Sequence, residues 1–140
     1  MQQLEQRQVE SVKNQLVQRL KDQCYEVEQD ASLTGKSGGE HSFDILARKS
    51  HDFIAYTISI EIVVLDDNQE ISLAEVFTFD DKCYDCGIQD KVLVAFPKVD
   101  STGARFARSQ RINVFDKEGW ESFLASPPPV KQGEKIAYCV

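Results

Sequence analysis

The sequence predicts a single α/β domain in which helices flank a central mixed β-sheet. Its 140 residues are enough for one domain with a core of its own. Segments of strand and helix type alternate along the second half of the chain, which is typical of parallel crossover connections. The run 53–64 is apolar enough for a central strand that is buried on both faces.

The first half of the chain predicts one helix followed by three strands. Between Gln8 and Cys24, apolar residues recur at spacings of three and four, which indicates an amphipathic helix. The alternating segment 24–28 predicts a short strand, and the glycine-containing stretch 33–40 predicts a turn region. Residues 42–48 and 53–64 are rich in β-branched and aromatic residues on either side of a polar turn, so they predict a hairpin.

The second half predicts alternating helices and strands. Gly87 is a typical residue just past the end of a helix, although Phe77-Thr78-Phe79 could equally support a strand upstream of it. Asp116 is a suitable N-cap for a closing helix that contains Trp120 and Phe123. The expected order is helix 71–86, strand 91–97, helix 101–110, strand 112–115 and a helix after Asp116.

Domain organisation follows from these elements. Residues 1–125 are expected to form the domain, and residues 126–140 a Pro-rich C-terminal arm that contains Pro127-Pro128-Pro129. The last residues of the arm are apolar enough to dock on a protein partner or on a second copy in a homodimer. The chain has no apolar stretch of membrane-spanning length and no signal-peptide core, so we expect a cytoplasmic protein without a membrane partner.

The charge balance limits the partners. Sixteen Lys and Arg against 23 Asp and Glu give a net charge of -7, which opposes long-range attraction to nucleic acid. A DNA-binding role therefore needs a local basic patch, for which Arg105, Arg108 and Arg111 are the candidates, although a solvated helix face is the simpler interpretation. A single Cys83-x-x-Cys86 pair is weak evidence for zinc.

Several residues, taken with the order of elements, resemble a known nuclease pattern. That pattern has a Glu in the first helix, an aromatic-x-Val strand, a Ser-Gly loop, an Asp on the next strand and a Glu on the one after. The matching positions are Glu10, Tyr25 with Val27, Ser37 with Gly38, Asp44 with Ile45, and Glu61. The chain thus resembles the Mrr-like restriction endonucleases and archaeal Holliday-junction resolvases of the PD-(D/E)XK superfamily. The resemblance implies a restriction-endonuclease-like, three-layer fold.

The resemblance also implies a site for phosphodiester hydrolysis. Asp44 and Glu61 would hold Mg²⁺ or Mn²⁺, with Glu10 in an outer position, because hard divalent cations prefer carboxylate oxygens. In these families a lysine stands two residues beyond the Glu, but here that position is Val63. Lys36 is the first candidate to replace it, and Lys49 or Lys82 could also reach the site from elsewhere. Asp44 could instead only accept hydrogen bonds at the end of its strand.

These observations predict a nuclease-fold protein with a degenerate site that acts as an accessory nucleic-acid-binding module. One alternative is a metal-dependent DNA endonuclease that uses Asp44 and Glu61 with a migrated lysine. Another is a protein-interaction scaffold, which the net charge favours. The glycine-containing loop lacks the order of a phosphate loop, so no nucleotide cofactor is expected. The residues expected to touch DNA are Ser37, Gly38, His41, Arg105 and Arg108.

Overall fold

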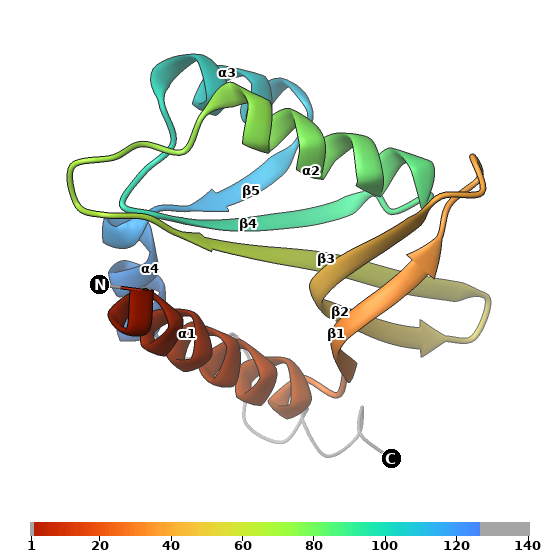
Figure 1. The fold of residues 1–140 in the computed structure, drawn as a ribbon. Coiled ribbons are helices and arrows are strands. Elements are labelled where there is room, and N and C mark those ends of the chain that lie inside the picture. The colour runs from red at the N-terminus through yellow and green to blue at the C-terminus, as the bar shows by residue number, and fades with distance from the viewer. Residues whose placement is uncertain (1, 127–140) are drawn as a thin grey trace.

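The computed structural model describes residues 2–126, so the predicted C-terminal arm lies outside the described residues except for its first residue. The order of helices and strands is the predicted one (Figure 1). The elements are α1 (Gln2–Asp22), β1 (Glu26–Thr34), β2 (Glu40–His51), β3 (Ile54–Val64), α2 (Leu73–Asp85), β4 (Asp90–Phe96), α3 (Ser101–Ser109), β5 (Ile112–Phe115) and α4 (Lys117–Ala125). No helix in this part of the chain is long and apolar enough to cross a membrane.

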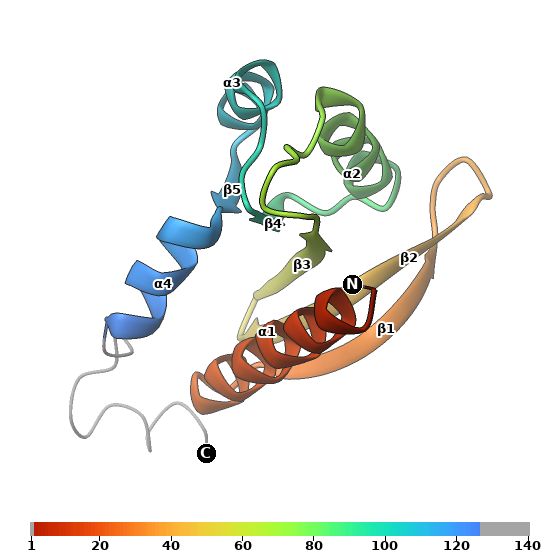
Figure 2. The same ribbon diagram turned by 60° about the vertical axis from the view of Figure 1, so that its left-hand side comes forward.

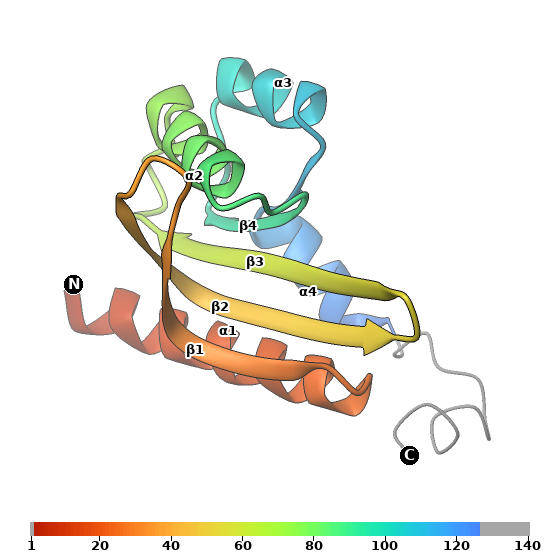
Figure 3. The same ribbon diagram turned by 90° about the vertical axis from the view of Figure 1, so that its right-hand side faces the viewer.

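The sheet is mixed, as predicted. Its strand order is β1-β2-β3-β4-β5. The first three strands pair antiparallel, whereas β3 with β4 and β4 with β5 pair parallel, so the hairpin half and the crossover half meet at β3. Figure 3 shows β1, β2 and β3 running side by side along this sheet. The apolar run that predicted a central strand is therefore the middle strand of the sheet.

Helices cover both faces, which confirms the three-layer α/β arrangement (Figure 2). One core lies between the sheet and the α1 and α4 layer, and it contains Val12, Leu16, Ile45, Ile60 and Trp120. The other core lies between the sheet and the α2 and α3 layer, and it contains Phe43, Leu46, Val76, Phe79 and Ala107. Apolar residues of the sheet are thus divided between two separate cores.

The structure departs from the predicted elements mainly around the first hairpin. β1 runs on to Thr34 and β2 begins at Glu40, so the predicted turn region shrinks to the five residues 35–39. Phe77-Thr78-Phe79 is helical: Phe79 is buried, and Phe77 points outward and packs against Phe106 at 5.6 Å between ring centroids. The helical period decides between the two predictions, because side chains two residues apart in a strand, such as Phe77 and Phe79, would point to the same face.

β2 separates from β3 next to Asp44, one of the two carboxylates predicted to hold a metal ion. The pairing of β2 with β3 ends at Ile45 opposite Ile60, while β2 continues alone beside β1. Phe43 belongs to the core under α2 and Ile45 to the core under α1, although residues two apart in a regular strand share a face. The strand therefore turns about its axis at Asp44, which lies where β2 leaves β3.

Candidate active site

Asp44 and Glu61 meet where β2 leaves β3. Asp44 Oδ2 accepts a hydrogen bond of 2.7 Å from the backbone N–H of Ile62, which has lost its β2 partner at this point. The Glu61 carboxylate accepts a hydrogen bond from the backbone of Asp44. The two carboxylates that the sequence singled out are therefore neighbours, as the hairpin register predicts.

Lys82, on α2, supplies a cation to this pair. Its Nζ lies 2.7 Å from Glu61 Oε2 and also donates to the carbonyl of Ser42. The ammonium lies 4.7 Å from the centroid of the Phe43 ring. Only 13% of the Lys82 side chain and 24% of the Glu61 side chain are exposed, so the ion pair is largely shielded from water.

The other two candidate lysines point elsewhere. Lys36 is exposed, and its ammonium lies 5.8 Å from the centroid of the Tyr84 ring. Lys49 donates to the carbonyl of Gln23 at 3.0 Å. Of the three lysines considered from the sequence, Lys82 is the one that contacts Glu61.

The residue two positions beyond Glu61 on β3 is the apolar Val63, and the lysine that contacts Glu61 comes from α2 instead. The Val63 side chain faces the α2 layer, as Glu61 does, but it packs against the apolar core there. A charged group at this position would lose that packing and be desolvated. A lysine on α2 approaches the same face of β3 from above, so it can contact Glu61 without entering the core.

The environment of Glu61 favours the arrival of further positive charge. Burial raises the pKa of Glu61, the hydrogen bond and charge of Lys82 lower it, and the nearby charge of Asp44 raises it again. The net result is a pKa above the ordinary value, so Lys82 offsets the burial of Glu61 and the charge of Asp44 only in part. A bound cation would lower this pKa.

Lys13 is a residue that the sequence reading missed. It lies on α1, is only 6% exposed, and its Nζ is 3.0 Å from Asp30 Oδ1. Burial lowers the pKa of Lys13, but the hydrogen bond and charge of Asp30, with the charges of Asp44 and Glu10, raise it above the ordinary value. The signal was present, since Lys13 interrupts the apolar stripe of the first helix.

The site offers two carboxylates for a divalent cation. Glu10 is exposed on α1, where its charge acts on Lys13. Among residues 2–126, no three acidic, His or Cys side chains gather closely enough to hold a metal by themselves. Asp44 and Glu61 would fit Mg²⁺ or Mn²⁺, because Mg²⁺ is commonly bound by one or two carboxylates and keeps several waters.

The loop expected to touch DNA is held by α2. Ser37 Oγ donates to Asp85 Oδ2 at 2.7 Å and the Ser37 backbone N–H donates to Oδ1 at 3.0 Å. His41 Nε2 lies 2.7 Å from the same Oδ2. The hydrogen bonds from Ser37, and then that from His41, lower the pKa of Asp85 to about 2. Asp85, which the sequence did not single out, therefore fastens the hairpin tip, where Gly38 takes a φ of +89°.

Arg105 and Arg108 are exposed on α3 and form no ion pair with another residue in the described range. α3 packs beside α2 and next to β5 (Figure 1). The two arginines thus remain available to a partner, but they are not part of the Asp44, Glu61 and Lys82 cluster.

Comparison with known proteins bears on the fold. No family model matches the chain, and no curated protein matches its sequence. A solved structure titled "Crystal Structure of Protein of Unknown Function AF1548" is similar, with a TM-score of 0.63 and 15% identity. The match covers 86% of this chain and 69% of that one. The chain therefore shares its α/β fold with a protein whose title gives no activity.

Proposed function

We propose that this protein is a metal-dependent DNA endonuclease of the PD-(D/E)XK type, with its lysine moved from β3 to α2. The observation that carries the proposal is the meeting of Asp44, Glu61 and Lys82, in which Lys82 Nζ lies 2.7 Å from Glu61 Oε2. Two carboxylates that can hold a divalent cation, beside one shielded ammonium, are groups that can support metal-dependent phosphodiester hydrolysis. An isolated carboxylate on a buried strand, by contrast, would only destabilise the fold.

Each residue has a definite role in this proposal. Asp44 and Glu61 would hold Mg²⁺ or Mn²⁺, which supplies Lewis-acid stabilisation and a more acidic bound water. Lys82 would donate a hydrogen bond to a phosphate oxygen or to the attacking water, and its charge would offset part of the developing negative charge. The hydrogen bond from the Ile62 backbone fixes the orientation of Asp44 without using its other oxygen. The cluster is thereby oriented before substrate arrives.

Cleavage assays test the proposal. Supercoiled plasmid and branched DNA are incubated with the protein and Mg²⁺ or Mn²⁺, beside Asp44→Asn and Lys82→Met. Both variants are expected to lose at least about a hundredfold in rate, the scale of a lost acid–base or charge-stabilising group. Lys98→Met is the matched control, because the Lys98 side chain is exposed and, among the described residues, its ammonium forms an ion pair with Glu70 at 3.7 Å. Cleavage that survives in both variants would refute the assignment.

A second candidate is a nucleic-acid-binding module with an inactive site. Two observations favour it: Val63 stands at the position of the family's lysine, and Lys82 already donates to both Glu61 and Ser42. In this case DNA binding without metal persists in Lys82→Met and weakens with salt. Arg105→Ala with Arg108→Ala should lower that binding. If the protein cleaves nothing and binds no DNA at low salt, the protein-interaction scaffold remains.

A further inference from the structure

The last turn of α2 is bound to the turn between β1 and β2, although the two lie far apart in the sequence. Asp85 is the final residue of the helix, and its carboxylate accepts hydrogen bonds from Ser37 and His41. Its carbonyl oxygen accepts a further hydrogen bond of 2.9 Å from the backbone N–H of Lys36. Figure 1 shows this turn beside the end of the helix. We call the contacts of Asp85 with residues 36, 37 and 41 the Asp85 anchor.

The anchor is built closely around the carboxylate. Only 18% of the Asp85 side chain and 25% of the His41 side chain are exposed. A Cβ at Gly35 would overlap the carboxylate, so the turn approaches Asp85 at a residue without a side chain. The hydrogen bonds from Ser37 and His41 lower the pKa of Asp85 to about 2. The carboxylate is therefore ionised, and can accept all of these hydrogen bonds, at any pH near neutrality.

The anchor lies one helical turn from Lys82. Residues three apart on a helix share a face, and Lys82 and Asp85 contact successive residues of β2. Asp85 meets His41, whereas Lys82 Nζ donates to the carbonyl of Ser42. The same ammonium donates to Glu61 on β3. Two residues beyond Ser42, β2 carries the aspartate of the candidate site. The anchor thus joins the last turn of α2 to the strand that holds one of the two candidate metal ligands.

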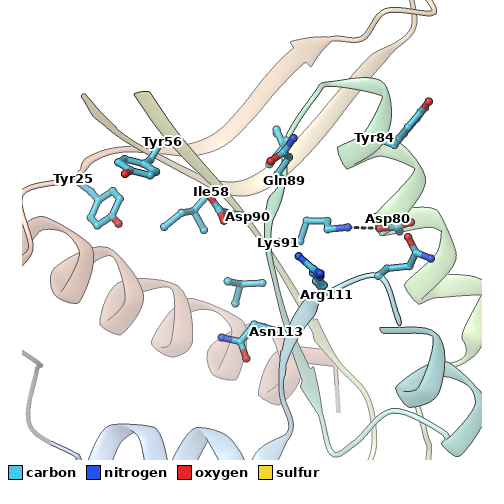
Figure 4. A pocket seen from close by; sticks show the side chains of 13 residues that line it. Tyr25, Tyr56, Ile58, Asp80, Tyr84, Gln89, Asp90, Lys91, Arg111 and Asn113 are labelled. Carbon is cyan, nitrogen blue, oxygen red and sulfur yellow. Dashed lines mark hydrogen bonds and ion pairs between the residues drawn. The ribbon is translucent and has the colours of Figure 1, made fainter. Parts of the chain in front are cut away.

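α2 is held on its other sides by contacts of a different kind. Phe79 and Cys83 are buried in the core under the helix, but apolar packing is non-directional. On the opposite flank from Lys82, since two residues span about half a turn, Asp80 pairs with Lys91 of β4 at 2.7 Å. Both residues line a cleft of about 760 Å³ (Figure 4). The hydrogen bonds of the anchor, which depend on angle as well as distance, hold the flank from which Lys82 projects.

We propose that Asp85 is a positioning residue for Lys82. Its hydrogen bonds with Ser37 and His41 set the last turn of α2 so that the ammonium one turn earlier meets Glu61. A lysine side chain loses rotamer freedom when it is held at one carboxylate, so a fixed backbone makes this contact less costly. Ser37 and His41 thereby act through the helix, without contact with DNA. The effect on cleavage rests on the proposed function, whereas the effect on the ion pair does not.

A double-mutant cycle measured with and without the anchor tests the inference. Urea unfolding of the unmodified chain, Lys82→Met, Glu61→Gln and the double variant gives the coupling free energy of the pair. The same four proteins are then made with Asp85→Ala. A general loss of stability cancels in the cycle, so a change in coupling reports the placement of the pair. Without the anchor, the coupling is expected to fall to less than half.

Gly35→Ala provides the same test without loss of a charge. The added Cβ would displace the Asp85 carboxylate, so the coupling should fall here also. Ser72→Ala is the matched control: Ser72 is the N-cap of α2 and accepts a hydrogen bond from the backbone N–H of Glu75, so this variant weakens the same helix at its other end. Its coupling should equal that of the unmodified protein. An unchanged coupling in Asp85→Ala or Gly35→Ala, or an equal fall in Ser72→Ala, would overturn the inference.

Cleavage kinetics separate positioning from contact with DNA. If Asp85 acts through Lys82, Asp85→Ala should lower kcat about tenfold or more and leave KM nearly unchanged, as expected when a catalytic group is misplaced. Asp85→Ala should then add no further loss of kcat to Lys82→Met. A raised KM with an unchanged kcat would instead mean that the turn binds DNA, and the positioning role would be wrong.

The two proposals fail separately. The coupling can be measured without cleavage, so a coupling that depends on the anchor in a protein that cleaves nothing would refute only the nuclease. Cleavage that is lost in Lys82→Met but normal in Asp85→Ala, with an unchanged coupling, would refute only the positioning role.

Discussion

Replacement of Lys82 by Met measures what the ion pair with Glu61 contributes to stability. Methionine keeps an unbranched side chain over the Phe43 ring, so the main change is loss of the ammonium. Glu61 then keeps its charge, its partial burial and the nearby charge of Asp44 without the group that now lowers its pKa. The folded state is expected to be destabilised and to become more sensitive to pH.

The magnitude follows from the exposure of the pair. Removing one partner of a fully buried pair costs about 3–5 kcal/mol. Because 24% of the Glu61 side chain is exposed, water can reach the remaining carboxylate, and we expect a loss of about 2–3 kcal/mol at pH 7. At about 3–4 °C for each kcal/mol in a domain of this size, the melting temperature should fall by roughly 6–12 °C.

The pH dependence has a definite sign. An acid whose pKa is raised by folding binds its proton more tightly in the folded state, so stability falls as pH rises from the unfolded value of about 4.5 through the folded one. Without Lys82 the folded pKa of Glu61 rises further. Lys82→Met should therefore differ from the unmodified protein more at pH 7.5 than at pH 5.

Urea unfolding of four proteins provides the measurement: the unmodified chain, Lys82→Met, Glu61→Gln and the double variant. The double-mutant cycle should give a coupling free energy of about 2 kcal/mol at pH 7. Val12→Ala removes core packing on the other face of the sheet and controls for general loss of stability, since its cost should not vary with pH. A Lys82→Met variant within about 0.5 kcal/mol of the unmodified protein, with no coupling, would refute the electrostatic reasoning.

Three further outcomes follow from contacts on α2. Because the pKa of Asp85 is about 2 instead of 3.8, its stabilising effect is complete above about pH 4 and is lost as pH falls toward 2. In Asp85→Asn, stability followed by circular dichroism should therefore fall less between pH 4 and pH 2 than in the unmodified protein. Gly35→Ala should lower the melting temperature, since a Cβ there would overlap the Asp85 carboxylate, and the loss should shrink in an Asp85→Ala background; equal losses would exclude the clash. Burial raises the pKa of Cys83 to about 11, so mass spectrometry should find it alkylated at pH 8 only after unfolding, unlike the half-buried Cys86.

The fold was largely predictable from local patterns. The apolar run of β3 and the N-cap Asp116 each specify an element almost to the residue, and the structure confirms these elements. The helical spacing of Val12 and Leu16 also specifies α1, but the helix begins at Gln2, well before the predicted start at Gln8. Phe77-Thr78-Phe79 was ambiguous, because aromatic and β-branched residues also favour strands. Burial of Phe79 against the sheet resolved the ambiguity, and that is a property of the whole fold.

The candidate site was predictable in its carboxylates but not in its cations. Asp44 and Glu61 lie on adjacent strands of one hairpin, so short-range register brings them together. Lys82 comes from a helix 21 residues beyond Glu61, and its approach depends on how α2 crosses the sheet. Lys13 likewise depends on the docking of α1. No local pattern selects one lysine among several when the contact is set by packing between layers.

Asp85 shows the same limit in another form. Its neighbours in sequence suggest only the polar end of a helix, yet it accepts hydrogen bonds from a loop 48 residues away. A carboxylate whose hydrogen bonds come from a distant turn cannot be recognised from the residues that flank it in the sequence. Ser37 and His41 were each predicted to touch DNA, but their shared hydrogen-bond partner Asp85 could come only from the structure.

Because Lys82 lies on α2, the cluster of Asp44, Glu61 and Lys82 is complete only when this helix is packed on the sheet. In a protein with both carboxylate and lysine on one strand, the groups stay together as long as the sheet does. Here the ammonium leaves Glu61 whenever α2 lifts from β3, even if every strand remains paired. Native-state hydrogen exchange can follow such partial opening, since amides of α2 and of β3 would exchange with different free energies. The lifetime of the complete cluster is therefore the lifetime of the docked helix.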